Sequence, residues 1–235
     1  MKKILCLLIT LSTFIYGEDL TDLILPRTNP QVSIQFYRML EDLDLLLKNQ
    51  SITYWLTAGT LLGAVRHQEM IPWDDDVDVA FFEEDIEALL ALTSALEDKG
   101  YELFYNQHYL KIYPINGHSI AKKEGEIYPW KYPFIDLFPM KQYEEKISYS
   151  SERLYQAFGA NDWFYVSDIF DLIPDAKFGP LQLPIPENAA EYCERVYGSD
   201  VWDIAYADYC HSEEKKLEKI KVKLVTKNRR EVVAH

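Results

Sequence analysis

The sequence predicts an α/β (α+β) fold in which one mixed β-sheet is packed with helices in a single domain. Its 235 residues suit one domain, and 48% of them are apolar, which is enough for a large core. Apolar residues recur with helical spacing over residues 31–49, whereas residues 101–105 and 109–115 alternate like strands. We therefore expect helices to pack against the sheet.

The first seventeen residues have the pattern of a secretory signal peptide or of an uncleaved N-terminal anchor. Two lysines precede residues 4–16, an apolar stretch that is too short to span a bilayer comfortably, and Gly17 is a small residue at the expected cleavage point. We expect a protein of the secretory pathway, periplasmic or extracellular, or one associated with a membrane through its N-terminus. Residues 18–30 are expected to be a polar linker.

The first predicted helix, residues 31–49, turns one apolar face toward the sheet. Its apolar residues recur at intervals of three or four, at Val32, Phe36, Leu40, Leu43 and Leu47. Residues 52–58 follow as a strand and residues 60–66 as one or two helical turns. The remaining expectations are helices over residues 83–99, 144–159 and 187–197, an extended segment over 178–186, and a fraying helix within a charged tail, residues 211–235.

Acidic residues crowd together at Asp74, Asp75 and Asp76 and then alternate with apolar residues at Asp78. In a strand Asp76 and Asp78 share one face, with Asp74 in the same parity, while Asp75 points away, so its replacement should matter far less. Clustered carboxylates repel unless they are solvated or neutralised by a cation, and oxygen ligands suit Mg²⁺ or Mn²⁺. An acidic loop is the alternative, but the apolar residues 79–82 favour a strand that enters a core.

A glycine–threonine pair stands between the predicted strand and the helical turns. Gly59 lets backbone N–H groups approach an anion, and a helix N-terminus favours negative charge. Thr60 suits the N-cap or a phosphate contact, and Arg66 suits a second phosphate oxygen. Alone the pair would fit any tight turn, and it becomes specific for a binding site only because paired aspartates follow within twenty residues.

A single acid, Asp136, stands inside the apolar strand expected over residues 134–138. Burying a lone carboxylate costs roughly several kcal/mol unless it is paired or bound to a metal. This cost makes Asp136 a candidate for the same site, although a carboxylate satisfied by a lysine or by the backbone remains the alternative. Lys111, in another predicted strand, is a candidate phosphate ligand or a solvated lysine.

The segments GTLLGAVR (residues 59–66) and IPWDDDVD (residues 71–78) resemble the signature of the LicD family, which includes bacterial phosphocholine transferases, fukutin and fukutin-related protein. The resemblance is strong over residues 52–82 and weaker over residues 130–202. It implies a nucleotidyltransferase-like fold over residues 31–210, in which the glycine–threonine turn and the D-x-D strand hold a nucleotide and a metal, and a later acid completes the site.

The resemblance also implies a function. The chain would be a metal-dependent phosphotransferase that moves phosphocholine or an alditol phosphate from a CDP-linked donor onto a hydroxyl of a glycan or glycoconjugate, for example in lipopolysaccharide biosynthesis. The alternatives are a D-x-D glycosyltransferase and a non-catalytic nucleotide- or glycan-binding protein of the same fold. The implied catalytic and metal-binding residues are Asp76, Asp78 and Asp136, with Asp74 as a further ligand, and the implied substrate-binding residues are Gly59, Thr60, Arg66, Trp73 and Lys111.

The net charge bears on possible binding partners, and the cysteine content bears on possible disulfides. A net charge of −14 would repel a phosphate backbone, so a nucleic acid is not an expected partner. Of the three cysteines, one lies in the expected signal segment. Cys193 and Cys210 are equally consistent with a disulfide and with two free thiols.

The N-terminal pattern generates the first testable prediction. Mass spectrometry of the mature protein should find a chain that starts near Glu18, because the expected signal peptidase site follows Gly17. An intact Met1 on a cytosolic protein would contradict export.

Overall fold

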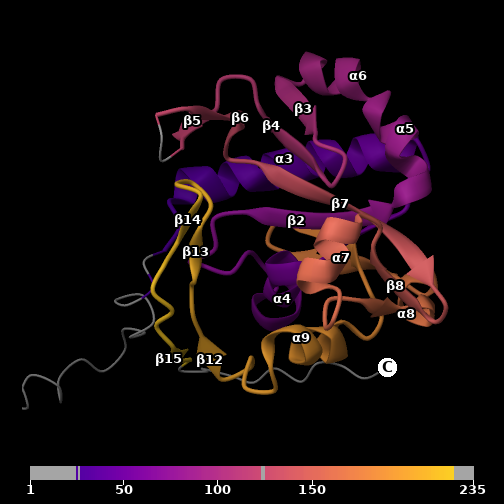
Figure 1. Ribbon diagram of the computed structural model, residues 1–235, viewed down its shortest axis with the longest axis vertical. Coiled ribbons are helices and arrows are strands. Elements are labelled where there is room, and N and C mark those ends of the chain that lie inside the picture. The colour runs from indigo at the N-terminus through magenta and orange to yellow at the C-terminus, as the bar shows by residue number, and fades with distance from the viewer. Residues whose placement is uncertain (1–24, 26, 123–124, 225–235) are drawn as a thin grey trace, which may run out of the picture.

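The computed structural model describes residues 25, 27–122 and 125–224 (Figure 1). The expected signal peptide or anchor, residues 1–17, lies outside the described residues, as does most of the expected linker. No helix within the described ranges is long and apolar enough to cross a membrane. These residues form a mixed sheet with helices against it, which confirms the predicted fold class.

The central sheet has seven strands, and one parallel pair lies in its middle. Five strands follow the order β1-β2-β7-β4-β3, and β8 pairs with both β7 and β9. Only β2 and β7 run parallel to one another; the other pairs of this sheet are antiparallel. The strands are β1 Tyr54–Leu56, β2 Val77–Phe82, β3 Tyr101–Tyr105, β4 Leu110–Pro114, β7 Ile135–Tyr143, β8 Lys146–Tyr149 and β9 Phe164–Tyr165.

The central strands are hydrophobic on both faces because both faces of the sheet are covered. In β2, Val77, Val79 and Phe81 have no exposed surface, and Ile135 and Leu137 of β7 are equally buried. Asp78 interrupts this apolar run directly beside Asp136 in the parallel register. The acids therefore stand near the start of strands that continue into the core, as predicted for residues 79–82.

The first predicted helix is present as α3 (Pro30–Asn49). The side chain of Asn29 caps it by accepting the N–H of Gln31 at 2.9 Å. Its predicted apolar face is buried at Phe36, Leu40, Leu43 and Leu47. In Figure 1, α3 runs along the sheet above β2, whereas α4 (Ala58–His67) and α9 (Ala189–Tyr197) lie together below it.

Two of the helices predicted before the charged tail differ from those observed. The helix expected over residues 83–99 is divided into η1 (Glu83–Asp85), α5 (Ile86–Leu90) and α6 (Thr93–Asp98). The hydroxyl of Thr93 donates to the Leu90 carbonyl at 2.7 Å, at the point where α5 ends. The helix expected over residues 144–159 begins as β8, because the alternating residues after a tight turn at Glu144 pair with β7, and only α7 (Glu152–Phe158) is helical.

The charged tail is not helical over its described part, residues 211–224. It contains short strands that pair with segments just upstream: β13 (Tyr209–Cys210) with β14 (Lys215–Lys216), and β12 (Ile204–Ala205) with β15 (Val222–Lys223). Val222 is buried in a small cluster with Leu25 and Ala205. This apolar anchor explains why the segment pairs rather than remaining a solvated helix.

The remaining elements surround the sheet. The helix expected over residues 187–197 is present as α9, and the extended segment expected over residues 178–186 contains a strand of the hairpin β10–β11. Cys193 and Cys210 are free thiols. The other bounds are β5 His118–Ala121, β6 Ile127–Tyr132, α8 Val166–Phe170, β10 Ile173–Phe178 and β11 Leu181–Ile185.

A buried polar network connects α9 to the turn between β1 and α4. Asp162 accepts hydrogen bonds from the hydroxyls of Tyr149 (2.6 Å) and Tyr192 (2.7 Å). The Tyr192 hydroxyl also lies 3.2 Å from both Thr57 Oγ1 and the Ala58 N–H. Ala58 has a φ of +47°, which is unfavourable for a residue with a Cβ. The network therefore holds a strained turn in place from beneath.

The network predicts how removal of the Tyr192 hydroxyl changes the stability of the fold. Tyr192→Phe should lower the free energy of unfolding by about 1–3 kcal/mol, because buried Asp162 loses one of its two phenol donors. The ring stacking on Phe164, with centroids 4.2 Å apart, would be retained. Urea denaturation measures the change, and Tyr105→Phe, which alters an exposed phenol, should change it by less than about 0.5 kcal/mol. Equal losses in the two variants would contradict the assignment.

Candidate metal centre and substrate cavity

Three carboxylates converge where β2 and β7 begin. Asp78 and Asp136 are direct neighbours across the parallel pair, and Asp76 stands one residue before β2. One oxygen from each of the three lies within 4.8 Å of the others, and all three residues are buried. The fold thus brings together Asp76, Asp78 and Asp136, the three acids predicted from the sequence to share one site.

Burial and mutual repulsion shape the electrostatics of this cluster. Burial raises the pKa of Asp78 well above its ordinary value, and Asp76 and Asp136 raise it further. The pKa of Asp74 is also raised well above its ordinary value, by burial and then by Asp76 and Asp75. Without an added cation the cluster therefore favours protons, and a divalent ion would compete with them.

Asp136 is partly neutralised by Lys111, which reaches it from β4. Lys111 Nζ lies 2.7 Å from Asp136 Oδ1 and 2.8 Å from Oδ2. Burial still dominates, so the pKa of Asp136 is raised. Lys111 is only 4% exposed, and its ammonium lies 3.4 Å from the ring centroid of Phe134. The alternative of a solvated lysine is therefore wrong.

The donor set fits a hard divalent cation. All its ligand atoms are carboxylate oxygens, which Mg²⁺ and Mn²⁺ accept. Asp136 Oδ1 has no well-directed hydrogen bond among the described residues, although Lys111 stands near it, so it is a buried acceptor still able to bind. Asp76, Asp78 and Asp136 are the residues that would hold the ion.

The glycine–threonine pair lies in the first turn of α4, beside the acids. A Cβ on Gly59 would stand 2.9 Å from Asp74 Oδ2, so the glycine lets the Asp74 carboxylate lie against the first turn of α4. Thr60 is not the N-cap expected from the sequence, because α4 begins at Ala58 and Thr57 occupies that position. The Thr60 hydroxyl instead accepts the N–H of Asp78 at 2.8 Å, which fixes the start of β2.

Arg66 and Trp73 face the C-terminal part of the chain. Arg66 donates to the carbonyls of Val201 (2.7 Å) and Ile204 (3.3 Å), and burial lowers its pKa to about 10. The Trp73 indole donates to the Tyr206 carbonyl at 3.2 Å. Both residues line a cavity, but their polar groups brace the loop that closes it.

That cavity has a volume of about 430 Å³ and contains the acid cluster. Of the five predicted substrate-binding residues, Gly59, Arg66 and Trp73 line the cavity. Thr60 and Lys111 do not line it: Thr60 hydrogen-bonds the backbone of Asp78, and Lys111 pairs with Asp136. Asp74 also lines the cavity. The wall also includes several aromatic residues: Phe138, Tyr149, Phe158, Tyr197, Tyr206 and Tyr209.

The sequence did not indicate two further contributors. His211 Nε2 lies 3.1 Å from Asp76 Oδ2, although 135 residues of chain separate the two and the sequence placed His211 in a solvated tail. Asp162 lines the cavity at the end of its tyrosine network. Neither residue stands in a local pattern, so spacing alone offered no signal for them.

Comparison with known proteins gives a consistent assignment. Residues 51–188 match the family described as LicD/FKTN/FKRP, nucleotidyltransferase domain. An uncharacterized protein of Rickettsia prowazekii is 29% identical over 177 residues, which are 75% of this chain and 58% of that protein. A counterpart in Rickettsia typhi is also 29% identical over 75% of this chain but 49% of its own length, so the chain spans about half the length of these relatives.

Shorter matches reach named enzymes. The ribitol 5-phosphate transferase FKRP of Homo sapiens is 49% identical over 41 residues, 17% of this chain and 8% of that protein. The lipopolysaccharide cholinephosphotransferase LicD of Haemophilus influenzae is 56% identical over 34 residues, 14% of this chain and 13% of that protein. A solved lincosamide antibiotic adenylyltransferase, LnuA, superposes with a TM-score of 0.38 at 15% identity, covering 70% of this chain and 84% of its own.

The family match covers more than half of the chain and includes the acid cluster and the glycine–threonine turn. The chain therefore belongs to the LicD family.

Proposed function

We propose that this chain is a metal-dependent transferase that moves a phosphorylated group from a CDP-linked donor onto a hydroxyl of a glycan or glycoconjugate. The observation that carries the proposal is the convergence of Asp76, Asp78 and Asp136 in a cavity of about 430 Å³ beside the first turn of α4. Membership of the LicD family supports a transferase.

The choice of transferred group follows from two relatives. Their printed names are ribitol 5-phosphate transferase and lipopolysaccharide cholinephosphotransferase. Both names describe the transfer of a phosphorylated alcohol, so phosphocholine and an alditol phosphate are the two groups to test. Lipopolysaccharide or another glycoconjugate would be the acceptor.

The residues of the cavity have distinct tasks in this reaction. Asp76 and Asp78 would hold Mg²⁺ or Mn²⁺, with Asp74 available as a further ligand, and the bound ion would offset the charge of the donor diphosphate. The first turn of α4 begins beside the acids, and the absence of a side chain at Gly59 leaves its backbone open to a phosphate oxygen, with the Asp74 carboxylate next to it. Arg66 adds positive charge on the same wall.

Asp136 would complete the metal site or take the proton of the acceptor hydroxyl. Transfer forms a bond between the acceptor oxygen and the donor phosphorus, breaks the bond from that phosphorus to CMP, and releases the hydroxyl proton. In the second role the raised pKa of Asp136 would favour uptake of that proton, and Lys111, which lies within 2.8 Å of both carboxylate oxygens, would stabilise the charged form before transfer. The aromatic wall, including Trp73, would pack against base or sugar.

Two other functions use the same residues. A D-x-D glycosyltransferase would release a nucleoside diphosphate rather than CMP, and a binding protein of this fold would release nothing. The proposed location is the secretory pathway, periplasmic or extracellular, or a membrane reached through the N-terminus. This location is supported by the pattern of residues 1–17 alone.

A titration and a turnover assay separate these functions. Isothermal titration with CDP-choline and with CDP-ribitol, with and without Mg²⁺, should show binding that needs the ion. Incubation with a glycan acceptor should release CMP. Metal-dependent binding without CMP release would leave the binding protein, and turnover of a UDP- or GDP-sugar alone would favour the glycosyltransferase.

Substitution of the acids tests the metal centre directly. Asp76→Asn and Asp78→Asn should each lower the rate of CMP release by about a hundredfold or more, because each removes a charged ligand. Melting temperatures without metal should stay equal or rise, since one of several repelling carboxylates is neutralised. Glu84→Gln, on the exposed surface of η1, is the matched control. If neither variant altered turnover or the stabilisation by Mg²⁺, the metal site would be wrong.

The raised pKa values of Asp78 and Asp74 predict a pH dependence. Because the folded state holds these protons more tightly than the unfolded state, the stability of the metal-free protein should fall as pH rises through the raised pKa values. The rise in melting temperature caused by Mg²⁺ should increase over the same range, because the ion replaces those protons. Thermal melts between pH 5 and 8 measure both trends, which Asp78→Asn should flatten.

A further inference from the structure

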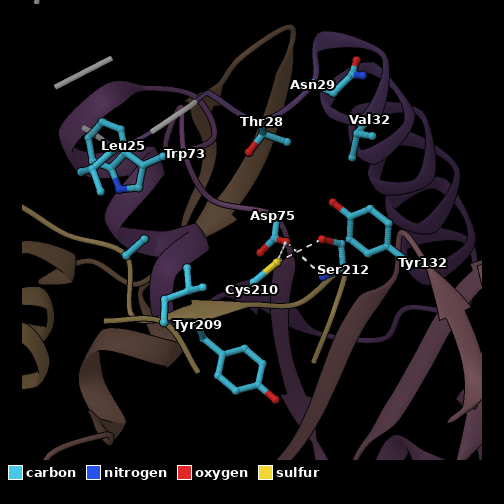
Figure 2. Close-up of a pocket in the computed structure, with 12 residues that line it drawn as sticks. Leu25, Thr28, Asn29, Val32, Trp73, Asp75, Tyr132, Tyr209, Cys210 and Ser212 are labelled. Carbon is cyan, nitrogen blue, oxygen red and sulfur yellow. Dashed lines mark hydrogen bonds between the residues drawn. The ribbon is translucent and has the colours of Figure 1, made fainter. Parts of the chain in front are cut away.

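The C-terminal hairpin, which comprises β13, β14 and the residues between them (residues 209–216), lies against the acidic run. The Asp75 carboxylate accepts the N–H of His211 on Oδ1 and the N–H of Ser212 on Oδ2, both at 3.0 Å. Cys210 Sγ approaches Asp75 Oδ2 at 3.7 Å. Figure 2 shows the Asp75 carboxylate turned toward Cys210 and Ser212. Three donors from one hairpin thus meet on one carboxylate.

Adjacent acids engage the same residue of this hairpin. Asp75 binds the backbone of His211, while Asp76 lies 3.1 Å from its ring nitrogen Nε2. Both acids lie in the irregular segment just before β2, so their side chains can reach the backbone and the ring of one residue. The acid that seems idle in the metal centre therefore determines where His211 stands.

Further contacts join the hairpin to Trp130 of β6 and to Phe134, just before β7. Glu214 accepts the indole N–H of Trp130 at 3.1 Å and the hydroxyl of Tyr209 at 2.9 Å. The ring of His211 packs edge-on against Phe134, with centroids 6.2 Å apart. Phe134 also lies under the ammonium of Lys111. The hairpin is thus packed against the groups that surround Asp136 as well as those that surround Asp76.

We propose that Asp75 and His211 are positioning residues for the metal centre. Asp75 docks the hairpin, and the docked His211 donates from Nε2 to Asp76 Oδ2, which fixes the carboxylate for metal binding and closes that side of the cavity. Groups that orient a ligand in this way commonly contribute to metal affinity without touching the metal. The inference rests on the proposed function, because it assigns these residues to the same site.

Metal affinity is the measurement that separates positioning from simple docking. Asp75→Asn keeps one acceptor oxygen but turns an NH₂ group toward an N–H donor, and His211→Ala removes the ring. Each should raise the Kd for Mn²⁺ about tenfold in the intact protein. His211→Gln, which can donate again to Asp76, should stay within about threefold of the wild type, and the Asp75→Asn/His211→Ala double variant should lose no more than either single variant.

Glu213→Gln is the matched control, because Glu213 lies on the same hairpin, is exposed and pairs with Lys215 at the surface. Its Kd for Mn²⁺ should equal that of the wild type. Hydrogen exchange of the His211 and Ser212 amides reports docking independently and should accelerate in Asp75→Asn. Circular dichroism checks folding; if Asp75→Asn fails to fold, the comparison of His211→Ala with His211→Gln decides.

The outcomes distinguish this inference from the proposed function. Faster amide exchange with an unchanged Kd for Mn²⁺ would show docking alone and overturn the inference. A weakened Kd in Asp75→Asn and His211→Ala would uphold it even if no CDP-linked donor released CMP, in which case the proposed function would fail instead. A wild-type protein that does not bind Mn²⁺ would overturn both.

Discussion

The parallel register of β2 and β7 places Asp78 beside Asp136 in a buried position, and much of the surrounding structure depends on that contact. Two carboxylates taken out of water repel one another and lose their hydration, so each needs compensation from nearby groups. Lys111 supplies a buried positive charge that hydrogen-bonds Asp136 and also lowers the pKa of Asp78. The compensation is incomplete, since the pKa values of both acids remain raised. This residual cost is the physical basis for expecting a divalent cation.

The site is assembled from segments that are far apart in sequence. The floor comes from β2, β7 and the first turn of α4, while the wall comes from the loop after α9 and from the C-terminal hairpin. Arg66 of α4 donates to carbonyls of that loop, and the Asp75 carboxylate accepts backbone N–H groups of the hairpin. Charged residues next to the site thus tie its two parts together. A change in the wall is therefore expected to affect the floor, which is why we assign Asp75 and His211 a role in metal affinity.

Strain and buried polarity occur together beneath the turn that would meet a phosphate. Ala58 has a left-handed backbone, and its N–H is held by Tyr192, which in turn is bound to Asp162. A network of this kind is costly when one member is missing, because each remaining polar atom stays buried. It therefore rigidifies the turn beside Gly59, and preorganised N–H groups are what a reaction based on positioning and charge requires.

The sequence by itself determined the mixed α/β fold, the helix over residues 31–49, the D-x-D strand and the acid in the strand near residue 136. Those features follow from local periodicity and from the cost of burying a charge, which can be judged from neighbouring residues. Tertiary structure decided the rest. In the folded chain Thr60 and Lys111 support the acids, and Arg66 braces the wall of the cavity. His211 lies beside Asp76, although 135 residues separate the two in sequence. Tertiary structure also replaced the expected tail helix by pairing short strands. These outcomes depend on partners that are distant in sequence, so no local pattern can encode them.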